Sequence, residues 1–480
     1  MKITDSLEKR YRDYLETLSL MSLRVLGRSS GVSKASSLNK DLLVEALIDI
    51  YTNRSLPAPR TNRGAPAKEN FIDPAILDQL DRIRRSAEEQ DDLFFTVSSG
   101  DQEPSIFDSP VYKGILEITT NGYGFLRAKN CQPSATGEDV FVSAPALHAL
   151  KLREGDFVAC TVQPAQKNGS PALDVVLSVN GFPVGKYERR PHFDALTAQY
   201  AQEKIALSKS DNSLSLRMLD LFAPVGKGQR ALVIAPPKAG KTTLLKDVAR
   251  AISQNHPELN LLVLLIDERP EEVTDFRMSV SGAEIMYSTF DEGAEHHIRV
   301  AELAIEHAKR IVELGQDVVV LLDSLTKLTR AYNAVSEGKG KTLTGGLDVG
   351  AFAEPKKFFG AARNTMEAGS LTILATALVE TGSRMDDVIY EEFKGTGNAD
   401  IFLSRDLAER RIFPAIDIRR SGTRKEELLL EKEELACIYK MREKRLTENV
   451  AGVIDMLGRT TDNADFIARL PKWLASYKSE

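Results

Sequence analysis

The sequence predicts a multidomain protein with a small N-terminal helical module, a five-stranded β-barrel and a C-terminal α/β domain built on a parallel sheet. Three observations support this prediction. Apolar and charged residues alternate at helical spacing over residues 4–52. Short runs of β-branched and aromatic residues, separated by turn residues, extend from Tyr112 to about Val179. From about residue 213, strand-like apolar runs alternate with helical patterns, as expected of a parallel sheet covered by helices.

The length and composition of the chain are those expected of a soluble protein with several domains of common size. The 480 residues are enough for about three domains of common size. With 42% hydrophobic and 28% charged residues, the composition is typical of a soluble globular protein. No apolar run approaches the roughly 18 residues of a membrane span, and no signal-peptide pattern begins the chain, so we expect a cytoplasmic protein without membrane contact. The net charge of −6 excludes a basic coat over the whole chain, so contacts with nucleic acid must be local.

Composition along the chain divides it into five segments. The helical module is expected over residues 1–54, and a Pro-rich and then acidic stretch over 55–110 predicts a mostly flexible linker. Residues 111–180 are expected to form the barrel, whose short strands fit the OB-fold or cold-shock type. A connector over 181–212 leads to the α/β domain at 213–480, which is expected to end in helices.

The segment 231–245, ALVIAPPKAGKTTLL, predicts a nucleotide site. An apolar strand-like run is followed by a loop and then by a helical pattern. In this arrangement the backbone N–H groups of the loop and the positive N-terminal end of the helix can face a bound anion. Lys241 is placed to reach the β- and γ-phosphates, and the Thr242 hydroxyl to hold Mg²⁺. Ala235 replaces the first glycine of the usual G-x-x-x-x-G-K-[ST] pattern, but the flanking strand and helix favour a nucleotide site over a chance loop. The residues of this predicted site are Pro237, Lys238, Ala239, Gly240, Lys241, Thr242 and Thr243.

Two acidic residues follow predicted strands of the same sheet. Ligands of an open α/β sheet bind beyond the carboxyl ends of its strands. Asp323 ends VVVLLD and is expected to hold Mg²⁺ through water, whereas Glu268 ends LLVLLIDE and is expected to deprotonate the water that attacks the γ-phosphate. Taken alone, an acidic residue at the end of a strand is also explained if it only caps the helix that follows. Their combination with Lys241 in one sheet favours nucleotide chemistry.

Two further basic patterns remain open on sequence alone. Residues 340–342 repeat the letters GKT without a preceding strand, so they predict no second phosphate loop. The surrounding segment EGKGKTLTGG is either a plain surface loop or a mobile finger that grips an anionic polymer. Arg411 and Arg424 are candidates for an arginine that stabilises charge on a transferred phosphate, or else plain surface arginines.

The predicted barrel carries a pattern typical of nucleic-acid binding. Tyr123, Phe125 and Arg127 recur at period two and therefore share one face of a strand, and the glycines between them are expected to let bases approach the rings. Asp139 and Phe141 add an acceptor and a further ring. The alternative is that the alternating aromatics form the barrel core.

With these motifs in place, the chain resembles the family of bacterial transcription termination factor Rho, whose members are ring-shaped hexameric RNA translocases. The resemblance runs from Tyr112 to the C-terminus, and more loosely over the helical module. It is carried by the segments RMLDLFAPVGKGQRALVIAPPKAGKT, LLIDERPEEVTD, LLDSLTKLTRAYN, LTGGLDVGAFAEPKKFFGAARN, YEEFKGTGNADI and FPAIDIRRSGTRKEELL. It implies a RecA-like P-loop ATPase domain with ATP and Mg²⁺ as cofactors.

The resemblance also implies roles for residues of the nucleotide site. Lys241 and Thr242 match the phosphate and Mg²⁺ positions, and Lys238 matches a second phosphate-contacting lysine. Glu268 matches the general base and Asp323 the metal carboxylate.

Other roles implied by the resemblance concern the subunit interface. Arg269 matches a residue that links the base to the neighbouring subunit. Arg424 matches an arginine finger that crosses the interface, with Arg411 beside it. Phe413 matches the aromatic residue that stacks on adenine.

The RNA-binding residues follow from the resemblance in the same way. Lys341 and Arg384 match the two pore loops that hold RNA, and the family usually has lysine at the Arg384 position. The barrel residues match a primary site for pyrimidine-rich single-stranded RNA: Tyr123, Phe125, Arg127, Asp139 and Phe141. The expected partners are therefore RNA, the RNA polymerase elongation complex, transcription elongation factors and five further copies of the chain.

Two other functions compete with an RNA translocase. A rotary-type ATPase subunit shares the sheet and phosphate loop, but it has no need for a base-stacking barrel or basic pore loops. A non-catalytic RNA-binding protein with a vestigial nucleotide fold would not require the complete set of Lys241, Thr242, Glu268, Asp323 and Arg424.

Overall fold

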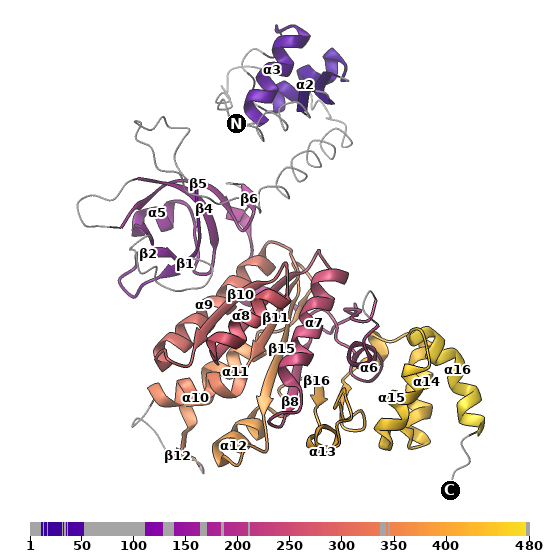
Figure 1. The fold of residues 1–480 in the computed structure, drawn as a ribbon. Coiled ribbons are helices and arrows are strands. Elements are labelled where there is room, and N and C mark those ends of the chain that lie inside the picture. The colour runs from indigo at the N-terminus through magenta and orange to yellow at the C-terminus, as the bar shows by residue number, and fades with distance from the viewer. Residues whose placement is uncertain are drawn as a thin grey trace. The chain divides into compact units, whose positions relative to one another are not determined.

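The computed structural model describes eight stretches of the chain, and they fall in two compact units, Met1–Ser109 and Pro110–Glu480 (Figure 1). The described residues are 11–51 (except 13, 17, 31, 33, 34 and 36), 111–127, 139–163, 170–183, 187–209, 212–336, 342–343 and 346–476. The predicted linker over 55–110 and the predicted RNA contact Lys341 lie outside the described residues. Among the described residues, none of the helices combines the length and apolarity needed to cross a bilayer.

The first unit contains the predicted helical module. Helices α2 (Leu20–Ser29) and α3 (Lys40–Tyr51) pack their leucine-rich faces together. The Ser19 hydroxyl accepts a hydrogen bond from the Ser22 amide at 3.1 Å, which caps α2. The Asn39 side chain accepts from the Leu42 amide at 2.9 Å at the start of α3.

The second unit begins with the barrel. Its elements are β1 (Tyr112–Ile118), β2 (Gly124–Arg127), β3 (Val140–Val142), α5 (Ala144–Ala149), β4 (Phe157–Gln163), β5 (Ala172–Val179) and the short β6 (Phe182–Pro183). The sheet order is β3-β2-β1-β4-β5-β6, and a further pairing of β3 with β5 closes strands β1 to β5 into a barrel. Alternate residues of each strand fill the barrel interior, among them Leu116, Leu126, Val140, Val142 and Val158. The prediction of a five-stranded barrel is confirmed.

The α/β domain is built on a seven-stranded sheet of order β10-β9-β11-β15-β8-β16-β17. Its strands are β8 (Arg230–Ala235), β9 (Asn260–Glu268), β10 (Glu284–Thr289), β11 (Val318–Asp323), β15 (Leu371–Leu378), β16 (Ala399–Phe402) and β17 (Gly422–Thr423). Only β17 is antiparallel to its neighbour in this sheet. The central strands are buried on both faces, which explains their continuous apolar sequences.

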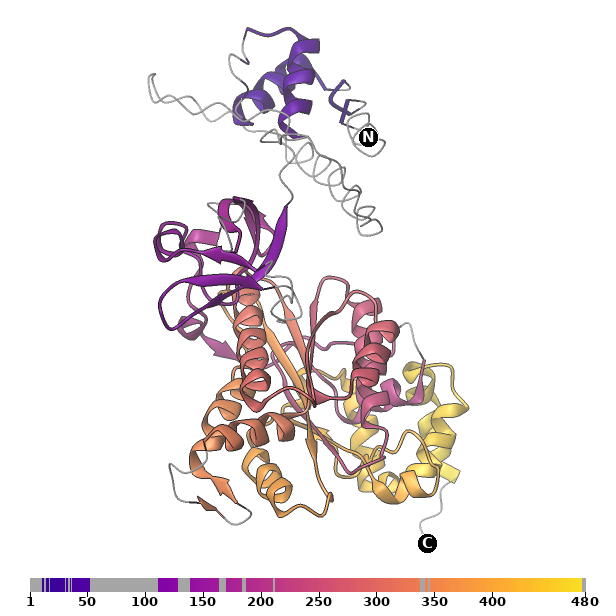
Figure 2. The ribbon, with the colours of Figure 1, turned by 60° about the vertical axis from the view of Figure 1, so that its left-hand side comes forward.

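Helices cover both faces of this sheet (Figures 1 and 2). One face packs against α6 (Leu214–Phe222), α7 (Lys241–Asn255) and α8 (Pro270–Ser279). The C-terminal helices α14 (Lys432–Glu443), α15 (Val450–Gly458) and α16 (Asn463–Ser476) pack against one another and, through α14 and α15, against α6, so they extend the same apolar cluster beyond the sheet. The other face packs against α9 (Ala294–Glu313), α10 (Leu325–Val335), α11 (Ala353–Gly360) and α12 (Arg384–Phe393).

Short elements complete the second unit. They are η1 (Tyr187–Arg189), η2 (Phe193–Ala195), β7 (Ala198–Gln199), β12 (Thr342–Leu343), β13 (Leu347–Asp348), η3 (Val349–Phe352), β14 (Asn364–Thr365), α13 (Arg405–Glu409), η4 (Glu426–Leu428) and η5 (Leu446–Glu448).

A buried network of charges fixes the barrel to helix α9. Arg190 donates from both terminal nitrogens to the two carboxylate oxygens of Asp156, at 2.6 Å each. The fully buried carboxylate of Glu313, at the end of α9, accepts from Arg153 at 2.8 Å and from the Phe193 amide at 2.9 Å. Because buried carboxylates are costly without donors, this network ties the barrel, the connector and α9 to one arrangement.

Gly155 allows the barrel to approach α9 closely. A Cβ atom at this position would lie 2.4 Å from the carbonyl carbon of Glu306 and 2.5 Å from the amide nitrogen of His307. The Gly155 carbonyl oxygen lies 2.8 Å from His307 Nδ1. Gly155 also has a φ of +85°, which disfavours any other residue.

We expect Gly155→Ala to destabilise the protein more than Gly181→Ala. Gly181 has a similar φ of +78°, but no atom lies within 4 Å of a Cβ atom placed there. Both substitutions cost about 1–2 kcal/mol for the left-handed backbone, and only Gly155→Ala adds a clash with the backbone of α9. Chemical denaturation of both variants measures the difference. Equal losses of unfolding free energy would contradict the described contact between barrel and helix.

Candidate functional site

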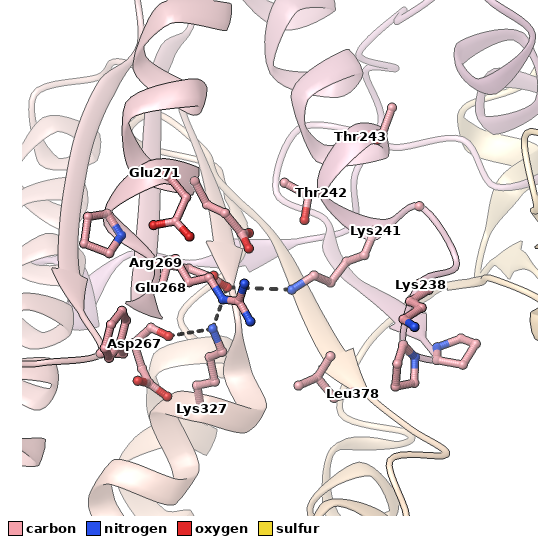
Figure 3. Close-up of a pocket in the computed structure, with 16 residues that line it drawn as sticks. Lys238, Lys241, Thr242, Thr243, Asp267, Glu268, Arg269, Glu271, Lys327 and Leu378 are labelled. Atoms are coloured by element: carbon pink, nitrogen blue, oxygen red, sulfur yellow. Dashed lines mark hydrogen bonds and ion pairs between the residues drawn. The ribbon is translucent and has the colours of Figure 1, made fainter.

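The phosphate loop lies where the sequence predicts it, at the carboxyl end of β8. Strand β8 ends at Ala235 and helix α7 begins at Lys241. Gly240 precedes the helix with a φ of +89°, and Lys238 has a φ of +64°. These conformations turn the loop so that the start of α7, with Lys241 and Thr242, borders the cavity (Figure 3). The first amides of a helix have no partner within it and are free to bind an anion. Ala235 is the last residue of the strand, and its methyl group is fully buried there.

Two carboxylates and two lysines meet beside this loop. Lys241 forms an ion pair with Asp323, and its Nζ lies 3.8 Å from Glu268 Oε1. Lys327 donates from Nζ to Glu268 Oε1 and to the backbone oxygen of Asp267, both at 2.6 Å. Figure 3 shows Lys241 extending toward Glu268 from α7 and Lys327 reaching it from the helix below. The four side chains therefore form one charge cluster, defined as Lys241, Glu268, Asp323 and Lys327.

The charge cluster shifts the proton affinities of its members. Burial, and then the charge of Asp323, raise the pKa of Glu268 above its ordinary value, while Lys327 and Lys241 oppose this increase. Burial alone would lower the pKa of Lys241, but Asp323 raises it above the ordinary value. A carboxylate whose pKa lies above the ordinary range, next to a phosphate loop, is suited to accept a proton from water.

Sequence reasoning missed Lys327. It lies on α10, which begins at Leu325, and the side chain of Ser324, the residue after Asp323, caps this helix. The signal available in the sequence was a basic residue four positions after the acid that ends the strand.

Two cavities adjoin the phosphate loop. The polar cavity, with a volume of about 1220 Å³, is lined by the phosphate loop, the charge cluster residues Lys241, Glu268 and Lys327, and Arg269. The apolar cavity, about 440 Å³, is lined by Leu214, Phe413 and their neighbours. Gly240 and Thr243 line both cavities, so a phosphate group in one and a purine in the other would lie on the two sides of the loop.

The side chains available for a metal fit Mg²⁺ bound together with a nucleotide. Among the described residues, no group of three or more His, Cys, Asp and Glu side chains is placed to hold a metal ion. The chain offers the Thr242 hydroxyl and the Asp323 carboxylate, which also accepts from Thr376 Oγ1 at 2.9 Å. The ammonium of Lys241 already pairs with Asp323, so a cation is accommodated there. Mg²⁺ commonly takes few protein ligands and completes its shell with phosphates and water.

The predicted arginines lie apart from one another. Arg269 is exposed at the rim of the polar cavity beside Glu268 (Figure 3). Arg424 is exposed and donates from its amide to the Asn398 oxygen at 2.8 Å, just before β16 begins. Because β16 runs parallel to β8, Arg424 lies at the edge of the sheet opposite the phosphate loop. Arg411 is exposed two residues before Phe413, and Arg384 is exposed at the start of α12.

The aromatic residues of the barrel form an exterior cluster. The ring centroids of Tyr123, Phe125 and Phe141 lie 5.5–5.8 Å apart. All three rings are partly exposed, whereas Gly124 and Leu126 between them face the interior. The alternative that the rings fill the barrel core is therefore wrong.

The predicted role of the glycine between the rings is also wrong. A Cβ atom at Gly124 would lie 2.7 Å from Leu116 Cδ1, inside the barrel. Gly124 therefore allows β1 and β2 to pair closely and does not open a path for bases.

A cation and two carboxylates adjoin the rings. The Arg127 guanidinium lies 4.8 Å from the Phe125 ring centroid. Arg127 forms ion pairs with Asp139 and with Glu117, whose Oε2 accepts from Arg127 Nε at 2.6 Å. Sequence reasoning identified Arg127 and Asp139 but missed Glu117, the residue opposite Phe125 on the neighbouring strand. Exposed rings beside a cation suit a surface on which unpaired bases stack.

Comparisons with known proteins support both the nucleotide site at the phosphate loop and the aromatic surface of the barrel. Residues 112–184 match the RNA-binding domain of the Rho termination factor family. Residues 215–423 match the nucleotide-binding domain of the ATP synthase alpha/beta family. The barrel is thus an RNA-binding domain and the α/β domain a nucleotide-binding domain.

Curated relatives match most of the chain. Transcription termination factor Rho of Bacillus subtilis is 54% identical over 355 residues, which cover 73% of this chain and 82% of the relative. The factor of the same name from Aquifex aeolicus is 53% identical over 363 residues, 74% of this chain and 83% of the relative. The factor of the same name from Thermotoga maritima is 47% identical over 370 residues, which cover 76% of this chain and 86% of the relative. The chain therefore belongs to the family of transcription termination factor Rho.

Proposed function

We propose that the protein is an ATP-dependent RNA translocase that binds nascent RNA and terminates transcription by dissociating RNA polymerase complexes. The observation that carries this proposal is the presence, in one chain of the Rho family, of a phosphate loop with an adjacent charge cluster and of an exterior aromatic surface. The match to the ATP synthase alpha/beta family covers the α/β domain only, so it gives no separate support for a rotary subunit.

In the proposed hydrolysis reaction, Glu268 accepts a proton from the water whose oxygen attacks the γ-phosphorus, and ADP leaves. Lys241 exchanges its ion pair with Asp323 for the β- and γ-phosphates. Thr242 and Asp323 would hold Mg²⁺, which when bound neutralises charge on the phosphates. Lys327 keeps Glu268 oriented and opposes the increase of its pKa. Phe413 supports the adenine ring.

The position of Arg424 supports a site shared between copies of the chain. An arginine at the opposite edge of the sheet cannot reach the phosphates of its own protomer, so we assign it to the site of a neighbour. Repetition of such a head-to-tail interface closes a ring, here a homohexamer. Arg269, at the rim of the cavity, is assigned to the contact between the base and the neighbouring subunit, and Arg411 is assigned to the same interface.

RNA is proposed to enter on the barrel and to pass through the ring. The rings of Tyr123, Phe125 and Phe141 stack bases, with a preference for pyrimidines, and Arg127 faces the adjoining phosphate. Arg384 holds RNA in the central channel together with Lys341. The partners are RNA polymerase elongation complexes, with elongation factors as further partners, and the protein acts in the cytoplasm.

The direct test of this function is ATP turnover measured with and without a cytidine-rich RNA strand. We expect turnover to rise strongly with RNA and to vanish in Lys241→Ala, which removes the cation that stabilises the phosphates. Turnover that is the same without RNA, or that survives Lys241→Ala, would exclude the proposed mechanism. Tight RNA binding without any turnover would favour the non-catalytic alternative instead.

Lys327 is expected to set the pH range of ATP hydrolysis. The base must be ionised, so activity falls as the pH drops through the pKa of Glu268. Lys327 lowers that pKa, and Lys327→Met should therefore move the acidic limb of the pH–rate profile to higher pH. The same substitution at the exposed Lys432 of α14 serves as a control. An unchanged acidic limb in Lys327→Met would show that Glu268 is not the titrating base.

Mixed oligomers test whether Arg424 acts on a neighbour. Arg424→Ala and Lys241→Ala subunits should each be inactive, yet an equal mixture should recover activity at about a quarter of the sites. Each site needs an intact Lys241 from one subunit and an intact Arg424 from its neighbour, and each of these is present in about half of the subunits. Glu268→Gln mixed with Lys241→Ala should recover nothing, because both residues line the cavity of one protomer. Equal behaviour of the two mixtures would contradict a shared site.

A further inference from the structure

The exterior face of the barrel runs without interruption from the aromatic cluster to helix α9. In the β1–β2 pair, Glu117 lies opposite Phe125, and Ile115 lies opposite Arg127. Directly opposed residues share one face of a sheet. Ile115 is fully buried in the apolar cluster that contains the inner face of α9. The surface that carries the rings therefore adjoins the nucleotide-binding domain.

Glu117 links the two domains by binding two arginines. Its carboxylate accepts from Arg127 Nε at 2.6 Å, on the side of the rings. On the other side it forms a two-point ion pair with Nε and Nη2 of Arg299, a residue of α9. The side chains are largely shielded from water, with 16% of Glu117, 13% of Arg127 and 34% of Arg299 exposed. Burial alone would raise the pKa of Glu117, but the hydrogen bonds from Arg299 and Arg127 lower it, so the carboxylate is charged at neutral pH.

Three contacts fix the plane of the Arg127 guanidinium. They are the hydrogen bond from Nε to Glu117, the ion pair from Nη1 to Asp139, and the packing of the guanidinium over the Phe125 ring. A planar guanidinium that is held at two nitrogens can direct its remaining N–H groups only one way. Glu117 thus determines where the cation beside the rings points.

We propose that Glu117 is a positioning residue for RNA capture, and that Arg299 of the nucleotide-binding domain holds Glu117 in place. The affinity of the barrel for single-stranded RNA then depends on a side chain of the other domain. The inference rests on the RNA-binding surface proposed above. Because coupling between two events is reciprocal, RNA bound at the rings also favours the docked position of the barrel on α9.

A structural role alone would have a different signature. Glu117 keeps its ion pair with Arg127 when Arg299 is lost, and the barrel is already fixed to α9 by the buried network of Asp156, Arg190 and Glu313. Loss of Arg299 should therefore alter RNA affinity while the unfolding midpoint and nucleotide affinity stay close to those of the unmodified protein.

The test is a double-mutant cycle read by fluorescence anisotropy of a labelled cytidine-rich RNA on the full-length protein. We expect Arg299→Gln to weaken binding about three- to tenfold, and Glu117→Gln to weaken it at least as much. In the Glu117→Gln background, Arg299→Gln should have no further effect, because Arg299 acts only through Glu117. Arg299→Lys, which keeps the charge without the two-point contact, should give an intermediate loss.

Two control variants make the outcome decisive. Arg459→Gln removes the same charge and an ion pair of 2.7 Å with Asp455 on α15, away from the barrel, and should leave RNA affinity unchanged. Phe125→Ala should weaken RNA binding whatever the role of Arg299. If Phe125→Ala has no effect, the proposed RNA surface itself fails. If Phe125→Ala weakens binding but Arg299→Gln behaves like Arg459→Gln, or if the losses of Arg299→Gln and Glu117→Gln multiply, the positioning role is wrong.

Discussion

The nucleotide site depends on a balance of charge at the carboxyl edge of the central sheet. Glu268 and Asp323 end adjacent parallel strands, so the fold itself brings two buried carboxylates together. Two like charges in this position repel each other, and the lysines that approach them make the arrangement tolerable. One of these lysines belongs to the phosphate loop. An incoming triphosphate therefore competes for Lys241 and changes the charge balance around Glu268.

The same sheet separates the parts of the proposed reaction in space. The phosphate loop lies at the carboxyl edge of the strands, and Arg424 lies at the amino edge. A single protomer cannot bring them together, so the geometry favours hydrolysis at a contact between two copies. Helix α9 carries the second connection, because the buried Glu313 and the partly buried Arg299 both join it to the barrel. The proposed RNA surface is thus attached to the same domain that holds the phosphate loop.

The sequence predicted those features that depend on neighbouring residues. The strand, loop and helix around Lys241 appear as consecutive letters, and alternation placed Tyr123 and Phe125 on one face. Lys327 was missed because its partner Glu268 is 59 residues away in the sequence and the packing of α10 brings them together. Arg299 and Glu117 are 182 residues apart. The role of Gly124 was wrong because the alternation that places Tyr123 and Phe125 on the exterior places Gly124 on the interior, against Leu116.

The central claim is that ATP is cleaved only where two protomers meet and that single-stranded RNA controls this cleavage. The most direct measurement is the hydrolysis rate per protomer over a dilution series, with and without cytidine-rich RNA, together with mass from light scattering. We expect the RNA-stimulated rate per protomer to fall as the oligomer dissociates. A monomer that hydrolyses ATP at the full rate without RNA would contradict it.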